Sequence, residues 1–216
     1  MSTSSLITLA DPRSPVAEAF RTLRTNLIFS SLDRPLTTLL VTSATPEDEK
    51  SLTLANLAVT MAQGGRRTIL VDCDLRHPRQ AEIFGVAAQP GLTDLVLSSG
   101  DQPRLTATGV EGLQLLPAGA QAPNPADLLS SRRLEAVIAE LKAQADMVLF
   151  DAPPVLAVTD AALLASKLDG VLLVVTAGQT RREHAQRAKD LLEKIHVRIV
   201  GTVLTNATVD RSISIY

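Results

Sequence analysis

The feature that most constrains this chain is an aliphatic strand that runs directly into a loop ending in lysine and serine. Residues 37–53 have the sequence TTLLVTSATPEDEKSLT. In a phosphate-binding loop, backbone N–H groups surround an anion and a lysine reaches the β- and γ-phosphates. Glycine normally supplies the positive φ angles of such a loop, but Glu47 and Glu49 occupy two of these places. The sequence therefore predicts a phosphate site, opened by Lys50 and Ser51, with an unusual negative charge.

Length and composition are those of one folded domain, which we expect to cover residues 1–216. The chain is 45% apolar and only 2% aromatic, so its core must be aliphatic. The net charge of −2 provides no global basic field for nucleic acid. The single cysteine, Cys73, cannot form an internal disulfide, and no apolar run approaches the roughly 18 residues that span a bilayer. These observations predict a cytoplasmic protein.

Short aliphatic segments alternate with amphipathic segments along the chain. This alternation is typical of an α/β fold in which helices cover both faces of a mostly parallel sheet. The predicted strands are residues 38–42, 68–72, 113–116, 147–151, 171–176 and 199–204. The predicted helices are residues 51–63, 78–84, 131–144, 157–167 and 181–195. Residues 1–13 and 207–216 lack a clear period and are predicted to be mobile ends.

Three predicted strands lead into residues that suit a nucleotide and a metal ion. Ligands of parallel sheets bind at the carboxyl ends of the strands. The first strand leads to Lys50 and Ser51, the second to Asp72 and Asp74, and the fourth to Asp151. Each group alone is also compatible with a turn, a helix cap or a surface ion pair. Because all of them belong to the same sheet edge, together they predict a nucleotide site with oxygen ligands for Mg²⁺.

Several stretches of the chain resemble the bacterial tyrosine kinases that control capsule and exopolysaccharide export. VTSATPEDEKSLTLANLA, TILVDCDLRHP and MVLFDAPPV resemble their Walker A, Walker A′ and Walker B motifs. SPVAEAFRTLRTNL resembles the ExxRxxR helix that joins subunits into rings, and residues 117–131 resemble a Pro-Asn-Pro segment. The resemblance covers about residues 14–206. It implies a P-loop NTPase fold of the deviant-Walker type, which the MinD- and ParA-like ATPases share.

The resemblance implies ATP and Mg²⁺ as cofactors and a role for each matching residue. Lys50 would neutralise the transferring phosphate, and Asp72 would accept the proton of a tyrosine hydroxyl. Ser51, Asp74 and Asp151 would hold the metal. Arg76 would stabilise charge or contact a subunit, and Asn206 would contact the adenine base. The nucleotide-binding loop would comprise Thr45, Pro46, Glu47, Asp48, Glu49, Lys50, Ser51 and Leu52.

The resemblance also implies partners. Glu18, Arg21 and Arg24 form one charged stripe on a helix expected at residues 14–30; by itself such a stripe is a solvated face with an internal ion pair. In the family it is a subunit contact of a homo-oligomeric ring. The acceptor would be Tyr216, which is the only tyrosine, whereas family members usually carry a cluster. A separate membrane-embedded polysaccharide chain-length or activator protein, recruitment to the inner face of the plasma membrane and a cognate tyrosine phosphatase are implied as well.

Three functions stay open at the level of sequence. The first is an ATP-dependent tyrosine autokinase that regulates capsular or exopolysaccharide biosynthesis and export. The second is a nucleotide-binding regulator of that pathway with weak or no transfer, because acids in the loop repel a triphosphate and a left-handed residue without glycine costs about 1–2 kcal/mol. The third is a partition-type ATPase. No nucleic acid is expected as a partner, and the basic stripe is predicted to be a solvated helix face; it consists of Arg181, Arg182, Arg187 and Lys189.

Overall fold

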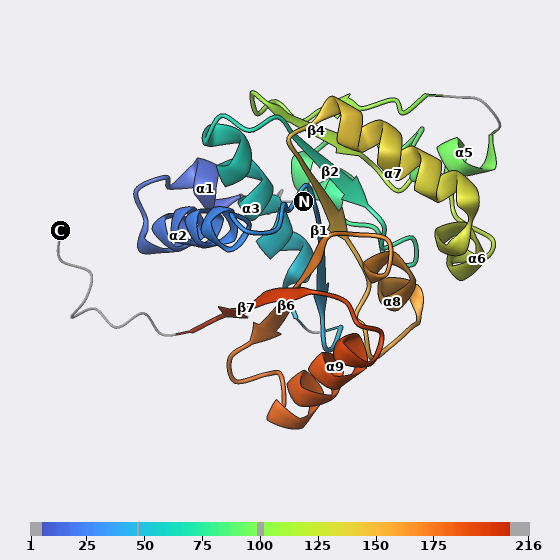
Figure 1. The fold of residues 1–216 in the computed structure, drawn as a ribbon. Helices are drawn as coiled ribbons and strands as arrows, with labels where there is room; N and C mark the ends of the chain where they lie inside the picture. The colour runs from blue at the N-terminus through green and yellow to red at the C-terminus, as the bar shows by residue number, and fades with distance from the viewer. Residues whose placement is uncertain (1–5, 47, 99–101, 208–216) are drawn as a thin grey trace.

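A seven-stranded sheet forms the centre of the molecule (Figure 1). The computed structural model describes residues 6–46, 48–98 and 102–207. The strands are β1 (Thr38–Ser43), β2 (Thr68–Asp72), β3 (Thr106–Ala107), β4 (Leu113–Leu116), β5 (Met147–Asp151), β6 (Gly170–Thr176) and β7 (Ile199–Thr205). Their order across the sheet is β3-β4-β2-β5-β1-β6-β7, and every pair is parallel except β3 with β4. The predicted, mostly parallel sheet is confirmed.

Helices cover both faces of this sheet, as the alternating sequence predicts. The helices of one face are α1 (Ile7–Ala10), α2 (Pro15–Ser30), α3 (Lys50–Gln63) and α4 (Gln80–Phe84). Those of the other face are α5 (Leu92–Leu97), α6 (Pro125–Ser130), α7 (Arg132–Gln144), α8 (Asp160–Ala165) and α9 (Arg182–Lys194). None of the helices in the described part of the chain is long and apolar enough to cross a bilayer.

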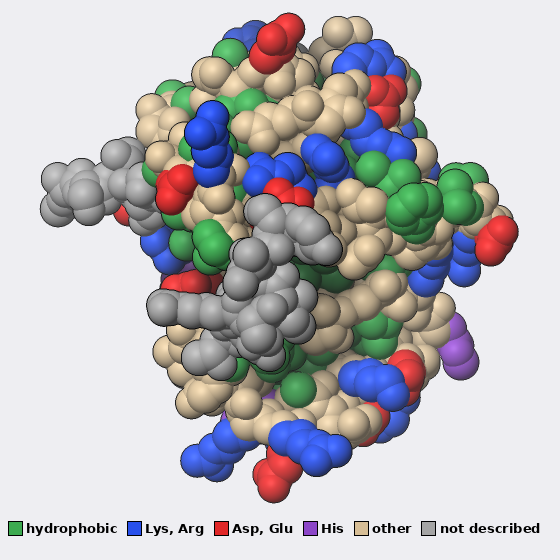
Figure 2. Space-filling model, turned by 90° about the vertical axis from the view of Figure 1, so that its left-hand side faces the viewer, with side chains coloured by type: hydrophobic (Ala, Val, Ile, Leu, Met, Phe, Trp, Pro, Cys, Tyr) green, Lys and Arg blue, Asp and Glu red, His purple; other side chains and the backbone are tan. Residues whose placement is uncertain are grey.

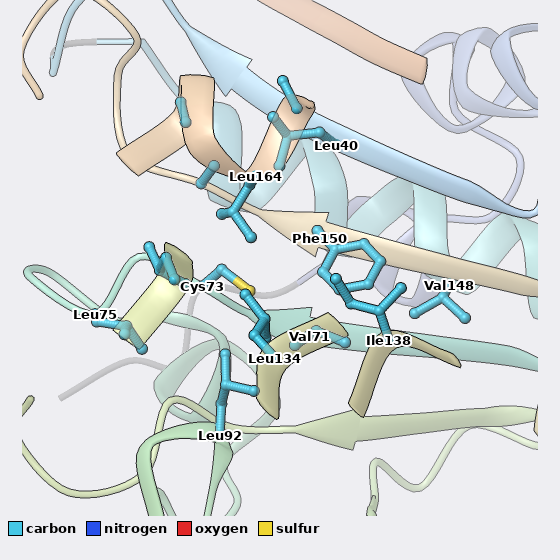
Figure 3. Packing of buried hydrophobic residues seen from close by; sticks show 14 of the residues in the cluster. Leu40, Val71, Cys73, Leu75, Leu92, Leu134, Ile138, Val148, Phe150 and Leu164 are labelled. Carbon is cyan, nitrogen blue, oxygen red and sulfur yellow. The ribbon is translucent and has the colours of Figure 1, made fainter. Parts of the chain in front are cut away.

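The core consists of two aliphatic layers, one on each face of the sheet. Side chains alternate between faces along a strand, so Leu39 of β1 belongs to the layer under α3 whereas Leu40 belongs to the opposite layer. Figure 3 shows part of this second layer, in which Phe150 of β5 lies among aliphatic side chains that include Val71 of β2 and Ile138 of α7. The aliphatic core predicted from composition is therefore confirmed.

The amino end of α3 differs from the amino ends of α2 and α7. Ser14 caps α2 by accepting a 3.2 Å hydrogen bond from the N–H of Ala17, and Ser131 caps α7 by accepting a 3.2 Å bond from the N–H of Leu134. Glu49 precedes α3, and no side chain caps that helix. Because the first N–H groups of a helix lack intrahelical partners, this end of α3 is suited to receive an anion.

The amino-terminal segment is better ordered than its sequence predicts. Residues 6–13 are not a mobile end: they include α1, and Leu6 is buried against the layer under α3. Both the backbone N–H and the hydroxyl of Thr8 donate hydrogen bonds to Asn56 Oδ1 of α3, at 3.1 and 2.9 Å. The prediction was wrong because four helical residues carry no period, and their order comes from contacts with α3. Residues 1–5 and 208–216 lie outside the described part of the chain.

The short elements β3, α5 and α6 were not predicted. The start of α5 depends on a close approach of two segments: a Cβ atom on Gly91 would lie 2.3 Å from the carbonyl oxygen of Pro117. Asp94 Oδ2 accepts hydrogen bonds from the N–H groups of Gly91 and Ala120, at 2.8 and 3.1 Å. The contacts with Pro117 and Ala120 join residues 26 positions apart, so no local pattern predicts them.

Charges of both signs are mixed on the surface. Figure 2 shows one face of the molecule, on which Lys and Arg side chains are interspersed with Asp and Glu side chains. Lys189 of α9 forms an ion pair with Glu193 at 3.3 Å. The residues of the basic stripe are exposed, as a solvated helix face requires: Arg181, Arg182, Arg187 and Lys189.

Candidate nucleotide and metal site

Three neighbouring strands bring the predicted site residues to one edge of the sheet. β5 lies between β2 and β1, and the register places Asp72 opposite Asp151. α3 begins at Lys50, directly after the loop that leaves β1. The residues that meet at this edge are all buried, with at most 7% of each exposed. They are Lys50, Ser51, Asp72, Asp74 and Asp151.

The ammonium group of Lys50 lies at the centre of the site. Lys50 Nζ is 2.8 Å from Asp74 Oδ2, 3.1 Å from Asp151 Oδ1 and 3.1 Å from Ser51 Oγ. Burial by itself would lower the pKa of this lysine, but Asp151 and Asp74 outweigh burial and raise it. Lys50 is therefore charged at neutral pH, and its charge compensates the two carboxylates.

The contacts of Lys50 also show that the residues fit a metal ion. Its three side-chain partners, Ser51, Asp74 and Asp151, are the predicted metal ligands, and their oxygen atoms converge on the position of Nζ. Mg²⁺ prefers oxygen ligands and usually combines one or two carboxylates with water and substrate phosphates. Within the described residues, no group of three or more His, Cys, Asp or Glu side chains could hold a metal by itself. Phosphate and water oxygens would therefore complete the shell.

Asp72 is fully buried and fixes the loop that follows β2. Asp72 Oδ2 accepts hydrogen bonds from the N–H groups of Arg79 and Gln80, at 3.0 and 2.9 Å, and Oδ1 accepts one from the N–H of Asp74 at 3.3 Å. Burial and the nearby Asp151 raise the pKa of Asp72 to about 8. The carboxylate of Asp72 is therefore more basic than that of an ordinary aspartate.

The acids of the phosphate loop have different surroundings. The carboxylate of Asp48 accepts hydrogen bonds from groups inside the protein. Its Oδ2 accepts one from the N–H of Thr45 at 3.0 Å. Its Oδ1 accepts one from the N–H of Thr176 at 3.0 Å and another from the hydroxyl of Thr180. Asp48 thus ties the loop to the end of β6. Glu49 is exposed, and its φ of −79° is not left-handed, so the expected backbone strain is absent there. Glu47 lies outside the described residues.

Two other predicted residues bond to neighbouring elements of the fold. Arg76 forms a bidentate pair with the fully buried Asp160 of α8, with Nε–Oδ2 and Nη2–Oδ1 distances of 2.8 and 3.1 Å. This pair raises the pKa of Arg76 and anchors the loop after β2 to α8. Asn206 follows β7 in a left-handed conformation with φ of 53°. Its Nδ2 donates to the carbonyl oxygen of Ala177 at 3.2 Å, and it does not line the cavity at Lys50.

Gln80 is part of this site, although no sequence motif predicted it. The residue is fully buried at the start of α4. Its side-chain Nε2 donates to Asp151 Oδ2 at 2.7 Å and to the carbonyl oxygen of Ser51 at 3.0 Å. A lone glutamine belongs to no phosphate-binding or metal-binding motif, so only the packing of α4 against α3 identifies it.

A cavity of about 320 Å³ lies beside Lys50. It is lined by Pro46, Asp48, Glu49, Lys50, Ser51, Leu52, Asp74, His77, Arg79, Ile83 and Pro154. A second hollow of about 580 Å³ shares His77 with this cavity and extends between the loop after β2 and residues 118–125. The structure thus offers space for a phosphate chain next to the uncapped end of α3. The second hollow is a separate space next to that cavity.

The charged stripe of α2 makes contacts within the chain. Arg21 Nη2 forms an ion pair with Glu18 Oε2 at 2.6 Å, and 64% of the Glu18 side chain is exposed. Arg24 Nη1 donates to the carbonyl oxygen of Thr60 at 2.8 Å, near the carboxyl end of α3. The ion pair expected of a solvated helix face is therefore present, and Arg24 is hydrogen-bonded to α3. Tyr216 lies outside the described residues.

Comparisons with known proteins agree with the P-loop geometry. The model of the ParA family, described as "NUBPL iron-transfer P-loop NTPase", matches residues 37–210. Tyrosine-protein kinase YwqD of Bacillus subtilis is 39% identical over 201 residues, which are 93% of this chain and 85% of YwqD. Putative tyrosine-protein kinase CapB of Staphylococcus aureus is 35% identical over 206 residues, which are 95% of this chain and 90% of CapB.

A solved structure supports the same relationship. The kinase domain of the Escherichia coli tyrosine kinase ETK matches with a TM-score of 0.88 and 27% identity, covering 97% of this chain and 84% of that one. The family model establishes the deviant-Walker P-loop fold, and the relatives establish the branch within it. The chain belongs to the bacterial tyrosine kinases, a family of ParA-type P-loop NTPases.

Proposed function

We propose that this chain is an ATP-dependent protein-tyrosine kinase that phosphorylates Tyr216 of a neighbouring copy and thereby regulates capsular or exopolysaccharide biosynthesis and export. The observation that carries the proposal is the convergence of Lys50, Ser51, Asp74 and Asp151 on one point, in a chain of the tyrosine kinase family. Phosphoryl transfer requires mainly positioning and neutralisation of charge, and this set of side chains supplies both.

The nucleotide phosphates bind in the cavity at the uncapped end of α3. Ser51, Asp74 and Asp151 would hold Mg²⁺, which would supply neutralisation of the phosphate charge. Lys50 cannot keep its present contacts in that state, because its ammonium group lies where these ligands converge. Lys50 therefore moves from the carboxylates to the phosphate oxygens as the site is loaded.

The acceptor hydroxyl approaches from the hollow that shares His77 with the nucleotide cavity. Its oxygen forms a bond to the γ-phosphorus, and the bond from that phosphorus to the bridging oxygen of ADP breaks. Asp72 accepts the hydroxyl proton, because burial and the nearby Asp151 make its carboxylate more basic than that of an ordinary aspartate. Because both oxygens of Asp72 already accept backbone hydrogen bonds, the loop after β2 must open slightly at this step.

The proposed assembly is a homo-oligomeric ring that forms through α2. Glu18 and Arg21 are available for this contact, since their ion pair lies at the surface. Arg24 is hydrogen-bonded to α3 and would hold α2 in place for this contact. A membrane-embedded activator would recruit the ring to the cytoplasmic face of the plasma membrane, and a tyrosine phosphatase would reverse the modification.

A second candidate is a nucleotide-gated regulator that binds ATP without transferring phosphate. The observation that favours it is the exposed Glu49 at the cavity, in a place where phosphate loops have glycine. Its charge weakens phosphate binding without abolishing it, because a side chain in water interacts only weakly with a nearby charge.

Intact mass measurement after incubation with Mg-ATP separates the two candidates. The wild type should gain one phosphoryl group, whereas Lys50→Met and Tyr216→Phe should gain none. Nucleotide binding is measured in parallel by calorimetry. A wild type that binds nucleotide but shows no phosphotyrosine, alone or with its membrane activator, would select the regulator.

A further inference from the structure

Gln80 contacts each of the three loops that build the nucleotide site. Its backbone N–H donates to Asp72 Oδ2 at the end of β2, where the loop after this strand begins, at 2.9 Å. Its side-chain Nε2 donates to Asp151 Oδ2 at the end of β5, at 2.7 Å, and to the carbonyl oxygen of Ser51 at the start of α3, at 3.0 Å. One fully buried side chain thus connects segments that lie 29 and 71 residues away in sequence.

The orientation of the Gln80 amide follows from these partners. Both protons of Nε2 point to oxygen acceptors, so the nitrogen and the oxygen cannot be exchanged. The other atom, Oε1, is buried and has no hydrogen-bond partner among the described residues. An unpaired buried acceptor costs free energy. Packing alone therefore does not explain an amide at this position, because an apolar side chain of the same length would fill the space without that cost.

The two oxygens of Asp151 have different partners. Oδ1 is 3.1 Å from Lys50 Nζ, and Oδ2 accepts the hydrogen bond from Gln80. Once Lys50 moves to the phosphates, Gln80 is the remaining side chain among the described residues that donates a hydrogen bond to this carboxylate. A carboxylate that ligates a metal is generally oriented by such a hydrogen bond from outside the ligand shell.

We propose that Gln80 is a positioning residue that orients Asp151 for the metal ion and holds that carboxylate in register with the start of α3. The inference rests on nucleotide and metal binding at the proposed site, but not on phosphate transfer. Gln80 acts through Asp151 and the carbonyl group of Ser51, and it does not touch the reacting atoms. Its loss should therefore weaken the metal more than the nucleotide.

The test compares two glutamine variants of the full chain. Gln80→Met retains the length of the side chain and removes the amide. Gln186→Met is the matched control, because Gln186 Nε2 also donates to an aspartate, Asp190 Oδ1 at 2.7 Å, but on the exposed surface of α9. Mn²⁺ binding is measured by electron paramagnetic resonance with a saturating non-hydrolysable ATP analogue. Binding of the analogue in EDTA is measured by calorimetry.

In Gln80→Met, we expect Mn²⁺ affinity to fall by about 10- to 100-fold, the usual effect of losing a hydrogen bond that orients a metal ligand. Affinity for the analogue in EDTA should change by less than about twofold, which is under 0.5 kcal/mol. Gln186→Met should match the wild type in both measurements. An equal fall of both affinities in Gln80→Met, or no change in either, would overturn the proposal.

A second variant covers the case in which Gln80→Met does not fold. Gln80→Asn keeps the amide but withdraws it by one methylene from Asp151, so the same selective loss of Mn²⁺ affinity is expected. The result is separable from kinase activity: a wild type that binds Mn²⁺ and the analogue, but does not label Tyr216, would refute transfer and leave the role of Gln80 standing. A wild type whose nucleotide binding does not depend on metal would overturn the role of Gln80.

Discussion

Charged groups are arranged differently at the two ends of the parallel strands. At the carboxyl ends, Asp74 and Asp151 share one ammonium group, that of Lys50, in a buried cluster. At the amino ends, the carboxylate of Asp169 has donors of its own. Asp169 Oδ2 accepts bonds from the N–H and hydroxyl groups of Thr37, at 3.0 and 2.7 Å, and a further bond from the start of β1.

The pKa values reflect this difference. Burial and Asp151 raise the pKa of Asp72 to about 8 at the carboxyl ends. Burial would also raise the pKa of Asp169, but the hydrogen bonds from Thr37 and Thr38 outweigh it and lower that pKa. The amino-end acid is thus satisfied by fixed donors of the fold. At the carboxyl ends, Asp74 and Asp151 share the cation of Lys50, which an incoming metal ion would replace in the proposed function.

The largest expected effect comes from removing that shared cation. In Lys50→Met, Asp74 and Asp151 lose their ammonium partner, so Mn²⁺ should bind without nucleotide. A unit charge at about 4 Å is worth roughly 4 kcal/mol at an effective dielectric of 20, so we expect affinity about 10²- to 10³-fold above that of the wild type. Electron paramagnetic resonance of Mn²⁺ measures it. Arg67→Met, which removes the exposed partner of Asp146 at the amino ends, is the control and should match the Mn²⁺ affinity of the wild type. Equal affinities of Lys50→Met and the wild type would contradict the exchange.

The next effect concerns the acids of the phosphate loop. Asp48→Ala leaves the N–H of Thr45 and the hydroxyl of Thr180 without their acceptor, and it removes one of the two acceptors of the buried N–H of Thr176. We expect the free energy of unfolding to fall by about 2–3 kcal/mol. Glu49→Ala, at an exposed neighbouring position, should change it by less than about 0.5 kcal/mol. Urea unfolding compares the three proteins, and similar losses in both variants would show that Asp48 has no special structural role.

A smaller effect is expected at the amino ends, with a defined dependence on pH. The folded pKa of Asp169 is lower than its ordinary value of 3.8, so its contribution to stability is present above that value and is lost as the pH falls through the folded pKa. Asp169→Ala should cost about 1–2 kcal/mol near neutral pH, a figure discounted for partial exposure. The difference from the wild type should narrow in strong acid. Denaturant unfolding near neutral pH and in strong acid measures the difference in free energy of unfolding between the two proteins. If this difference were the same at both pH values, the ionised form of Asp169 would not be the source of the stability.

The smallest effect comes from restoring a loop glycine. Glu49→Gly removes one exposed negative charge beside the cavity. A charge at about 4 Å in water is worth roughly 1 kcal/mol, so nucleotide affinity should rise about fivefold. Calorimetry measures this change, with Glu111→Gly in an exposed turn far along the sequence as the control. Unchanged affinity in Glu49→Gly would mean that the charge of this loop does not weaken phosphate binding.

Much of the fold could be predicted because the strands are buried on both faces. Each of the six predicted strands is present, with ends that differ by at most one residue, from Thr38–Ser43 to Ile199–Thr205. Continuous aliphatic runs of this kind stand out from the amphipathic helices between them. The expected meeting of Lys50, Asp72 and Asp151 then followed from topology, since parallel strands end at the same edge. Short elements such as α5 escaped prediction because their order depends on contacts between distant segments.

The site was less predictable in its hydrogen bonds. The sequence offered Asp48 and Glu49 as equivalent acids beside a phosphate, yet one is bonded to β6 and the other is exposed. Arg76 was expected to act on phosphate or on a neighbouring subunit, but its guanidinium is bonded to Asp160. The direction of a side chain depends on which donors and acceptors the packed chain brings within about 3 Å, and sequence spacing does not contain that information.

The sequence by itself determined the class of fold, the family and the edge of the sheet at which the chemistry lies, because residue type and local order suffice for strands, helices and motifs. Only the tertiary structure decided how the charges are shared. It placed the ammonium group of Lys50 among the proposed metal ligands and brought Gln80 to Asp151 across 71 residues. Hydrogen bonds and ion pairs act over a few ångströms in space, so the partners of a buried charge are settled only when the distant segments have packed together.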